Sequence, residues 1–310
     1  MRHEALRSAA VIGGGTMGAD IAAILVAGGW TAHVVEPSPA GRASLAARVA
    51  KSCAQLDAPF VAARLHAHPA APDAPWAGIG LAIECAPEDL ALKRRVFAEL
   101  ERLARPDATL ASNSSSFPIS AIGRGLATGA RMCGLHFFMP AHIVPLVEVV
   151  RGEATDPAVC ERLVADMKAL GKVPVLVRRD IPGFLANRIQ HALAREAFWL
   201  VDEGIASAED VDKAVRYGFG FRFIGAGPIL QKDLAGLDIH CAASATTFPT
   251  LNNSAEPARC LRERVAAGKL GVKTGEGFYK WPPERIAAEK ARYERALLDA
   301  LAILKRDVGP

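Results

Sequence analysis

The sequence predicts an α/β fold: an N-terminal, Rossmann-type, doubly wound and mostly parallel sheet followed by an all-α C-terminal domain. Two observations carry this prediction. Over roughly the first 150 residues, short apolar segments typical of strands alternate with longer segments typical of helices. After Asp180 the composition changes, and the rest of the chain favours helices and loops without clear strands. Since 310 residues also suggest two domains of ordinary size, we expect one domain at 1–180 and another at 181–310.

A glycine-rich turn follows the first expected strand, Ala9–Ile12. An apolar helix to about Gly28 comes next, and then a second strand, Ala32–Val35, that ends in an acidic residue. Strand, Gly-x-Gly-x-x-Gly, helix, strand and acid in this order are typical of a dinucleotide site, in which the phosphates lie at a helix N-terminus. The residues assigned to the cofactor by this pattern are Gly13, Gly15, Thr16, Met17, Gly18 and Glu36. Because a carboxylate binds ribose hydroxyls and repels a 2′-phosphate, the pattern predicts NAD rather than NADP.

The alternation continues along the first domain. We expect a helix at 40–54, a strand at 80–85, a helix at 88–103 and a strand at 108–112. A polar loop with three serines, residues 113–116, follows the last strand. It lies where open α/β sheets collect ligand-binding groups, although serines in a turn are also common caps and turn formers.

Two histidines, His66 and His68, stand close together in the segment RLHAHP. They could suggest a pair of metal ligands, but the sequence places no third ligand near them. We therefore expect a surface loop at this position and no metal site.

Two titratable residues lie within apolar runs near the end of the first domain. His136 ends one strand-like run, and Glu148 lies 12 residues later inside another, Leu146–Val150. A carboxylate among β-branched residues pays a large desolvation cost unless a partner accepts it, and a histidine that gains a proton is such a partner. On this segment alone, a catalytic pair and a core histidine with an exposed edge-strand glutamate are equally compatible with the pattern.

The second domain is expected to begin at a junction, Ile181–Gly183, and to continue as helices. Apolar residues at helical spacing then run to Gly204; they are Leu185, Ile189, Leu193, Ala197 and Leu200. Ser207 is expected to cap the next helix. Because a large apolar helix in so small a domain suggests packing against a partner, we expect a homodimer.

Composition narrows the class of protein. The net charge of +4 is spread along the chain without a basic block, which argues against nucleic acid as a partner. The N-terminus does not resemble a signal peptide, and no apolar run is long enough to span a bilayer, so we expect a soluble, cytoplasmic protein with no membrane partner. Six cysteines without a Cys-x-x-Cys pair are expected to be buried thiols of a reducing compartment: Cys53, Cys85, Cys133, Cys160, Cys241 and Cys260.

Seven motifs, in their order along the chain, resemble the 3-hydroxyacyl-CoA dehydrogenase family from end to end. They are GGGTMG, PEDLALK, SNSSS, GLHFFMP, PLVEVV, PGFLANR and KTGEGFYKW. The catalytic residues that this resemblance implies are Ser115, His136, Glu148 and Asn187. It also aligns Glu88, Lys93 and Lys273 with residues that contact the cofactor, where the sequence alone would favour surface charges.

The chemistry expected of these residues is the oxidation of an L-3-hydroxy group to a 3-oxo group. His136 is the only histidine with a carboxylate partner implied by the sequence, so we expect it to be the base. Glu148 would orient it and stabilise its charged form. Ser115 and Asn187 would donate to the substrate oxygen, where charge develops. The hydride goes to the cofactor.

The expected substrate depends on where the chain departs from the family. Only 51 residues separate Glu36 from Glu88, and they lack the longer, lysine-rich helical tail with which the acyl-CoA enzymes hold CoA. Several segments instead resemble the L-gulonate dehydrogenase and lambda-crystallin branch and the carnitine dehydrogenases, which act on free hydroxy acids. One of these segments, GFGFRFIGAGP, contributes Arg222, which is suited to bind a substrate carboxylate, although an exposed loop arginine is equally compatible. Met139 stands where both branches usually have asparagine.

We therefore expect an NAD-dependent dehydrogenase that prefers a compact free 3-hydroxy carboxylate. The alternative is a 3-hydroxyacyl-CoA dehydrogenase of fatty acid metabolism that acts on thioesters such as 3-hydroxybutyryl-CoA. A non-enzymatic, crystallin-like or NAD-binding protein is a remote alternative, because neither would need the four catalytic residues together.

Overall fold

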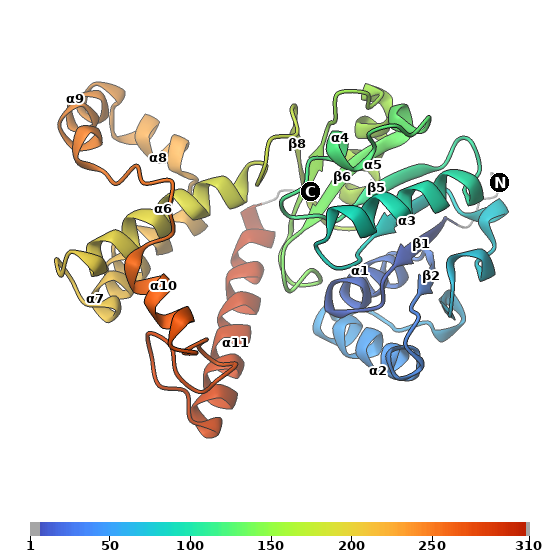
Figure 1. The fold of residues 1–310 in the computed structure, drawn as a ribbon, viewed down its shortest axis with the longest axis horizontal. Helices are drawn as coiled ribbons and strands as arrows, with labels where there is room; N and C mark the ends of the chain where they lie inside the picture. The colour runs from blue at the N-terminus through green and yellow to red at the C-terminus, as the bar shows by residue number, and fades with distance from the viewer. Residues whose placement is uncertain (1–6, 308–310) are drawn as a thin grey trace. The chain divides into compact units, whose positions relative to one another are not determined.

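The computed structural model describes residues 7–307 and contains two compact units, Met1–Asn187 and Arg188–Pro310 (Figure 1). The strands are β1 (Ser8–Ile12), β2 (Thr31–Val35), β3 (Leu65–His68), β4 (Leu81–Glu84), β5 (Thr109–Ser112), β6 (Met132–Phe137), β7 (Leu146–Val150) and β8 (Val173–Val177). The helices of the first unit are α1 (Thr16–Ala27), α2 (Pro39–Gln55), α3 (Leu90–Leu103), α4 (Ile119–Ile122) and α5 (Pro157–Ala169). Those that follow are α6 (Ala186–Asp202), α7 (Ala208–Lys213), α8 (Pro228–Ala235), α9 (Leu237–Thr247), α10 (Arg259–Ala266) and α11 (Pro283–Asp307).

The strands of the first unit form one eight-stranded sheet in the order β3-β2-β1-β4-β5-β6-β7-β8. Neighbouring strands are parallel except β6 and β7, which pair antiparallel with His136 opposite Glu148. The first six strands have the doubly wound order of dinucleotide-binding domains. The predicted fold class, a Rossmann-type sheet followed by helices, is confirmed.

Apolar side chains cover both faces of this sheet. Because successive side chains of a strand point to opposite faces, Val11 packs into the cluster that contains α1, α2 and α5, whereas Ile12 packs into the cluster that contains α3 and α4. Cover on both faces explains why the inner strands, such as β1 and β4, are apolar at nearly every position. It also leaves the carboxyl ends of the strands as the place where polar side chains gather.

The expectation of a surface loop around His66 and His68 is wrong, because these residues form the edge strand β3. This strand pairs in parallel with β2 and places His66 opposite His33. Half of its residues are exposed, so the strand lacks the continuous apolar run that identifies a buried strand. Three further elements of the first unit, α4, α5 and β8, have no counterpart among the predicted ones.

The second unit is helical within its described residues, as expected, and Ser207 caps α7 by accepting a hydrogen bond from the backbone N–H of Asp210. The expectation of six buried thiols is wrong for two of them: Cys241 is exposed and Cys85 is half-buried. Cys241 lies on α9, a helix without buried residues. None of the helices within residues 7–307 combines the length and apolar composition needed to cross a bilayer.

Candidate active site

The glycine-rich turn between β1 and α1 has the geometry of an anion site. A Cβ on Gly13 would lie 2.8 Å from the carbonyl oxygen of Cys85, and one on Gly18 would lie 1.8 Å from that of Gly13. At Gly15, by contrast, the space around a Cβ is open, so a ligand can approach the backbone there. No side chain caps α1, and its first turn, which includes Thr16 and Met17, holds no acidic residue. The free N–H groups of this turn therefore fit the pyrophosphate of NAD.

Glu36 closes the other side of this turn. Its Oε2 accepts from the N–H of Gly14 at 2.9 Å and its Oε1 from the N–H of Ser38 at 2.8 Å. These bonds fix the carboxylate beside the turn, and each oxygen keeps a lone pair that a ribose hydroxyl can use. The position of Glu36 therefore fits the adenine ribose of NAD.

Lys93 is buried inside the first unit at 1% exposure. Its Nζ donates to Glu84 Oε1 at 2.8 Å and to the carbonyl of Ala86 at 3.2 Å, and it lies 3.3 Å from Glu88 Oε2. An ammonium group has three protons, and these three partners account for them. The structure therefore places Lys93 as a support for Glu88.

Glu88 in turn holds the serine loop. It accepts from the Ser114 hydroxyl at 2.6 Å, and from both the hydroxyl and the N–H of Ser116 at 2.7 and 3.1 Å. Burial alone would raise the pKa of Glu88, but the hydrogen bonds from Ser114 and Ser116 outweigh it and lower the pKa. An ionised Glu88 thus fixes the residues on both sides of Ser115.

His136 and Glu148 form a buried pair with Ser115 beside it. Glu148 Oε2 lies 2.7 Å from His136 Nδ1, and Ser115 Oγ lies 3.1 Å from His136 Nε2. The exposed fractions are 2% for His136 and 0% for Glu148, so the alternative of an exposed edge-strand glutamate is wrong. Because the carboxylate accepts the proton of Nδ1, Nε2 is the nitrogen left to accept a proton on the side of Ser115.

The second oxygen of Glu148 is held by the start of α6. Oε1 accepts from the N–H of Leu185 at 3.1 Å and from that of Ala186 at 2.7 Å. Burial alone would raise the pKa of Glu148, but the bonds from His136 and from the N–H of Ala186 outweigh it, so the pKa lies below its usual value. An ionised Glu148 is therefore the state in which His136 is oriented.

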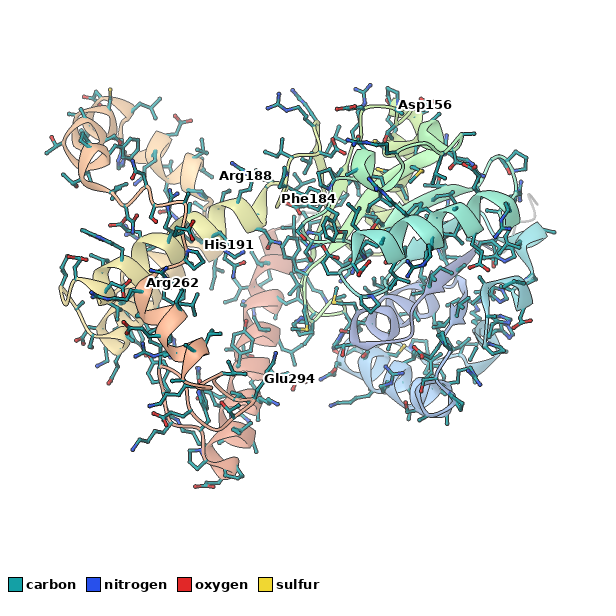
Figure 2. All side chains as sticks on the ribbon, in the orientation of Figure 1. Asp156, Phe184, Arg188, His191, Arg262 and Glu294 are labelled. Carbon is teal, nitrogen blue, oxygen red and sulfur yellow. The ribbon has the colours of Figure 1, made fainter. Side chains whose placement is uncertain are left out.

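Asn187 follows Ala186 directly on α6, so the structure brings it to the helix turn that contacts Glu148. Two aromatic residues that the sequence did not single out also contact His136. The ring of Phe138 lies 4.4 Å from the histidine ring, and that of Phe184, labelled in Figure 2, lies 5.6 Å from it. Gly183 and Phe184 both have left-handed backbones, with φ of 74° and 48°. The Pro-Gly pair before Phe184 was the available signal, because it marks a turn.

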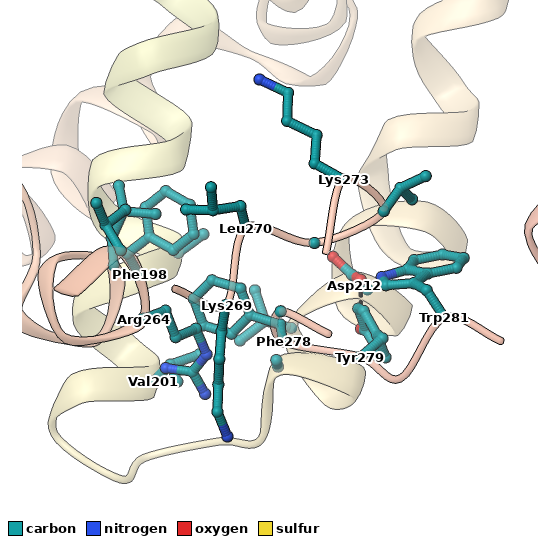
Figure 3. Close-up of a pocket in the computed structure, with 18 residues that line it drawn as sticks. Phe198, Val201, Asp212, Arg264, Lys269, Leu270, Lys273, Phe278, Tyr279 and Trp281 are labelled. Carbon is teal, nitrogen blue, oxygen red and sulfur yellow. Dashed lines mark hydrogen bonds between the residues drawn. The ribbon is translucent and has the colours of Figure 1, made fainter. Parts of the chain in front are cut away.

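The other two predicted contacts, Arg222 and Lys273, lie in the second unit. Arg222 is exposed on a single 3-10 turn, Gly220–Ile224. Lys273 lines a pocket of about 600 Å³ together with aromatic residues such as Tyr279 and Trp281 (Figure 3). Its ammonium group extends away from both of these rings (Figure 3). The roles of Arg222 and Lys273 stay predictions.

Both units match models of one family. The 3-hydroxyacyl-CoA dehydrogenase NAD-binding domain matches residues 8–181, and the C-terminal domain of the same family matches residues 183–281. A 5-formyl-3-hydroxy-2-methylpyridine 4-carboxylate 5-dehydrogenase from Mesorhizobium japonicum is 35% identical, over 97% of this chain and 99% of its own. The human mitochondrial hydroxyacyl-coenzyme A dehydrogenase is 36% identical, over 87% of this chain and 90% of its own.

A solved structure gives the same relation in three dimensions. The crystal structure of a 5-formyl-3-hydroxy-2-methylpyridine 4-carboxylic acid 5-dehydrogenase, described as an NAD+-dependent dismutase, superposes with a TM-score of 0.90. It is 33% identical and covers 97% of this chain and 99% of its own. This chain belongs to the 3-hydroxyacyl-CoA dehydrogenase family, and it is an NAD-dependent oxidoreductase of that family.

Proposed function

We propose that this member of the 3-hydroxyacyl-CoA dehydrogenase family oxidises the hydroxyl of a compact free carboxylate, with His136 as the base. The observation that carries the catalytic assignment is the line of the exposed Ser115 and the buried His136 and Glu148, in which Nε2 faces the serine hydroxyl. A substrate hydroxyl near that serine would place its proton within reach of Nε2.

The proposed proton path uses only residues of the first unit. His136 Nε2 takes the proton of the substrate hydroxyl as the oxygen becomes a carbonyl. Glu148 stabilises the resulting imidazolium from the other side of the ring. Ser115 and Asn187 donate hydrogen bonds to the oxygen while it carries developing charge. NAD, when bound, supplies the acceptor for the hydride that leaves the same carbon.

The preference for a free acid rests on two observations. A relative that matches 97% of this chain, and a solved structure that superposes with a TM-score of 0.90, are both named for a pyridine carboxylate. In addition, two of the four basic residues between Glu36 and Glu88 bind the protein's own backbone: Arg42 donates to the carbonyls of Glu36 and Pro37, and Arg48 to that of Gly15. Arginines engaged in this way are poor candidates for binding the phosphates of CoA.

A 3-hydroxyacyl-CoA thioester is the alternative substrate, and the 36% identity to the human hydroxyacyl-coenzyme A dehydrogenase favours it. An NADH absorbance assay of the full chain separates the two. The substrates are L-3-hydroxybutyrate, other free L-3-hydroxy acids, L-3-hydroxybutyryl-CoA and 5-formyl-3-hydroxy-2-methylpyridine 4-carboxylate. The formyl group of the last compound can follow the proposed step only as its hydrate, whose carbon carries both a hydroxyl and a hydrogen. We expect the highest kcat/KM with a free acid, whereas a thioester value higher by tenfold or more would overturn this preference. NAD binding without turnover of any substrate would contradict the proposed activity.

We further infer that the protein is a homodimer and that it is cytoplasmic. The support for a dimer is a set of apolar side chains of the second unit that are more than half exposed, among them Ile189 on α6, Ile229, Leu230 and Leu234 on α8, and Leu237 and Ile239 on α9. Apolar surface of this extent is typical of a protein interface. The location rests on the six cysteines without a Cys-x-x-Cys pair, which are typical of a reducing compartment.

A further inference from the structure

The loop between β6 and β7, residues 138–145, begins two positions after His136 and is held by a buried lysine. Lys172, just before β8, is 8% exposed. Its Nζ donates to three carbonyls of the loop, those of Ala141 at 2.6 Å, His142 at 3.1 Å and Val144 at 3.0 Å. An ammonium group inside a protein is costly unless its protons are accepted, so these bonds hold the loop firmly.

A carboxylate on α1, the helix that follows the glycine-rich turn, also holds this loop. Asp20 lies on α1, one turn after the free N–H groups at the start of that helix, and is 7% exposed. Its Oδ2 accepts from the N–H of Ala141 at 3.2 Å, and its Oδ1 accepts from the Ser52 hydroxyl at 3.0 Å. The His142 ring brings its Nδ1 to 3.0 Å from the same Oδ1.

His142 extends this contact to a third element. Its ring is 7% exposed, and its Nε2 lies 2.7 Å from Oε1 of Gln55, the last residue of α2. An imidazole N–H that donates to an amide oxygen fixes the orientation of the ring. The loop is therefore tied through buried polar groups to α1, to α2 and to the start of β8.

This position matters because the loop begins with Phe138, whose ring packs 4.4 Å from that of His136. The loop and the histidine thus form one wall of the site, and α1 carries the glycine-rich turn that fits NAD. The hydrogen bond from the N–H of Ala141 to Asp20 links that helix to the loop, whereas His142 Nδ1 lies beside the same carboxylate without a hydrogen bond. A shift of about 1 Å in groups that align two reactants can cost about 10²-fold in rate.

We propose that Asp20 is a positioning residue of the reaction, which fixes the 138–145 loop to α1 through the N–H of Ala141 and so aligns His136 with the bound cofactor. This rests on the proposed function, in which His136 is the base. Asp20 does not touch the reacting atoms. Its effect passes through the backbone of Ala141 and the ring of Phe138.

The matched variants are Asp20→Ala, Asp20→Asn and Ser52→Ala. Asp20→Ala removes the acceptor of the Ala141 N–H. Asp20→Asn keeps an oxygen for that N–H, and its NH2 can donate to the Ser52 hydroxyl. Ser52→Ala removes a hydrogen bond from the same carboxylate but leaves the loop contact intact. The kinetic measurements are kcat, the Kd of NAD, and the isotope effect on kcat with substrate deuterated at the carbinol carbon.

We expect Asp20→Ala to lower kcat by about tenfold to 10²-fold, to raise the isotope effect, and to change the Kd of NAD by less than threefold. Asp20→Asn and Ser52→Ala should stay within about threefold of the wild type. A purely structural role predicts a different result: fewer NAD-binding sites per chain with an unchanged isotope effect. That result, or an Asn variant as slow as the Ala variant, would overturn the proposal.

A second measurement does not depend on turnover, so it keeps the two proposals separate. Hydrogen exchange of the peptide that covers residues 138–145 is followed with and without NAD. We expect NAD to slow exchange in the wild type and in Ser52→Ala, and to have no effect in Asp20→Ala. If no substrate is oxidised, the proposed function fails while this measurement still decides on the link. Equal protection by NAD in all three proteins would show that Asp20 carries no link.

Discussion

At the scale of single residues, His136 has one hydrogen-bond partner at each nitrogen of its ring. Glu148 accepts from Nδ1 and leaves Nε2 to face Ser115. Replacing His136 with Gln retains a polar side chain but removes the group that can accept a proton near neutral pH. We expect kcat to fall by about 10²- to 10⁴-fold with little change in the Kd of NAD, measured by NADH absorbance and by fluorescence titration. Turnover close to that of the wild type would remove His136 from the role of base.

Glu148 uses both carboxylate oxygens at once, which glutamine cannot do. Oε2 accepts a hydrogen bond from His136, and Oε1 accepts hydrogen bonds from the N–H groups of Leu185 and Ala186. In Glu148→Gln the amide NH2 must face one of these donors, so either the histidine or the start of α6 loses its acceptor. We expect kcat to fall by about 10²-fold or more. The exposed Glu161→Gln on α5 is the matched control, and it should leave kcat unchanged.

The lowered pKa of Glu148 gives the same variant a pH signature. A carboxyl whose pKa is lower in the folded state stabilises the fold at pH values above its usual 4.5, and this contribution is lost as the pH falls through the folded-state pKa. The difference in Tm between the wild type and Glu148→Gln should therefore be largest near pH 7 and should shrink below pH 4.5. A difference that stays constant down to pH 3 would contradict this account.

At the scale of elements, the edge pair of β2 and β3 places three imidazoles on one face of the sheet. His33 Nδ1 lies 3.1 Å from His68 Nε2, and the ring of His66 stacks 4.9 Å from that of His33. Burial first, and then the neighbouring His66 and His68, lower the pKa of His33 to about 4. The folded protein therefore keeps His33 neutral at pH values where an unfolded chain would protonate it.

The sign of this effect on stability follows from linkage. The pKa of His33 is lower in the folded than in the unfolded state. The free energy of unfolding therefore has its full value above pH 6.5, the usual pKa of histidine, and falls between pH 6.5 and about 4. The loss is at most about 3.5 kcal/mol, since the pKa falls from 6.5 to about 4 and each pKa unit corresponds to about 1.4 kcal/mol. His33→Leu should flatten the denaturant-unfolding free energy over this range, whereas the exposed His191→Gln should not. An unchanged slope in His33→Leu would show that His33 does not cause the loss.

The same elements show what can be predicted from the sequence. Strands covered on both faces, such as β1 and β4, are continuous apolar runs, and the glycines of the turn before α1 are set by close backbone contacts, so both leave a local signal. The edge strand β3 has no such local signal in the sequence, because its stability comes from pairing with β2. In the candidate site, His136 and Glu148 can be proposed from the sequence because a charge within an apolar strand is unusual. The bond between Asp20 and Ala141 cannot be predicted, since these residues are 121 positions apart in the chain and only the fold brings them together.

At the scale of the whole molecule, the second unit buries little of its own apolar surface within the described residues. Helix α6 is 17 residues long and strongly amphipathic in sequence, yet none of its residues is buried. Helices α8 and α9 also have no buried residues. Helices in water depend on packing of an apolar face for most of their stability. A second copy of the chain that covers these faces would supply that packing, which is the physical basis of the proposed homodimer.

The α8 helix offers a direct test of this dimer. Leu230 and Leu234 are one turn apart on the same side, 51% and 77% exposed, whereas Lys232 lies between them in sequence and is exposed on another side. Leu230→Asp with Leu234→Asp places two charges in the proposed interface, where their desolvation is costly. We expect sedimentation velocity to show a dimer for the wild type and for Lys232→Glu, and a monomer for the double variant at micromolar concentration. The wild-type Tm should also rise with protein concentration, because dimerisation stabilises the folded chain by mass action. A wild-type monomer at these concentrations, or a Tm independent of concentration, would contradict the dimer and leave the apolar faces of α6, α8 and α9 without this explanation.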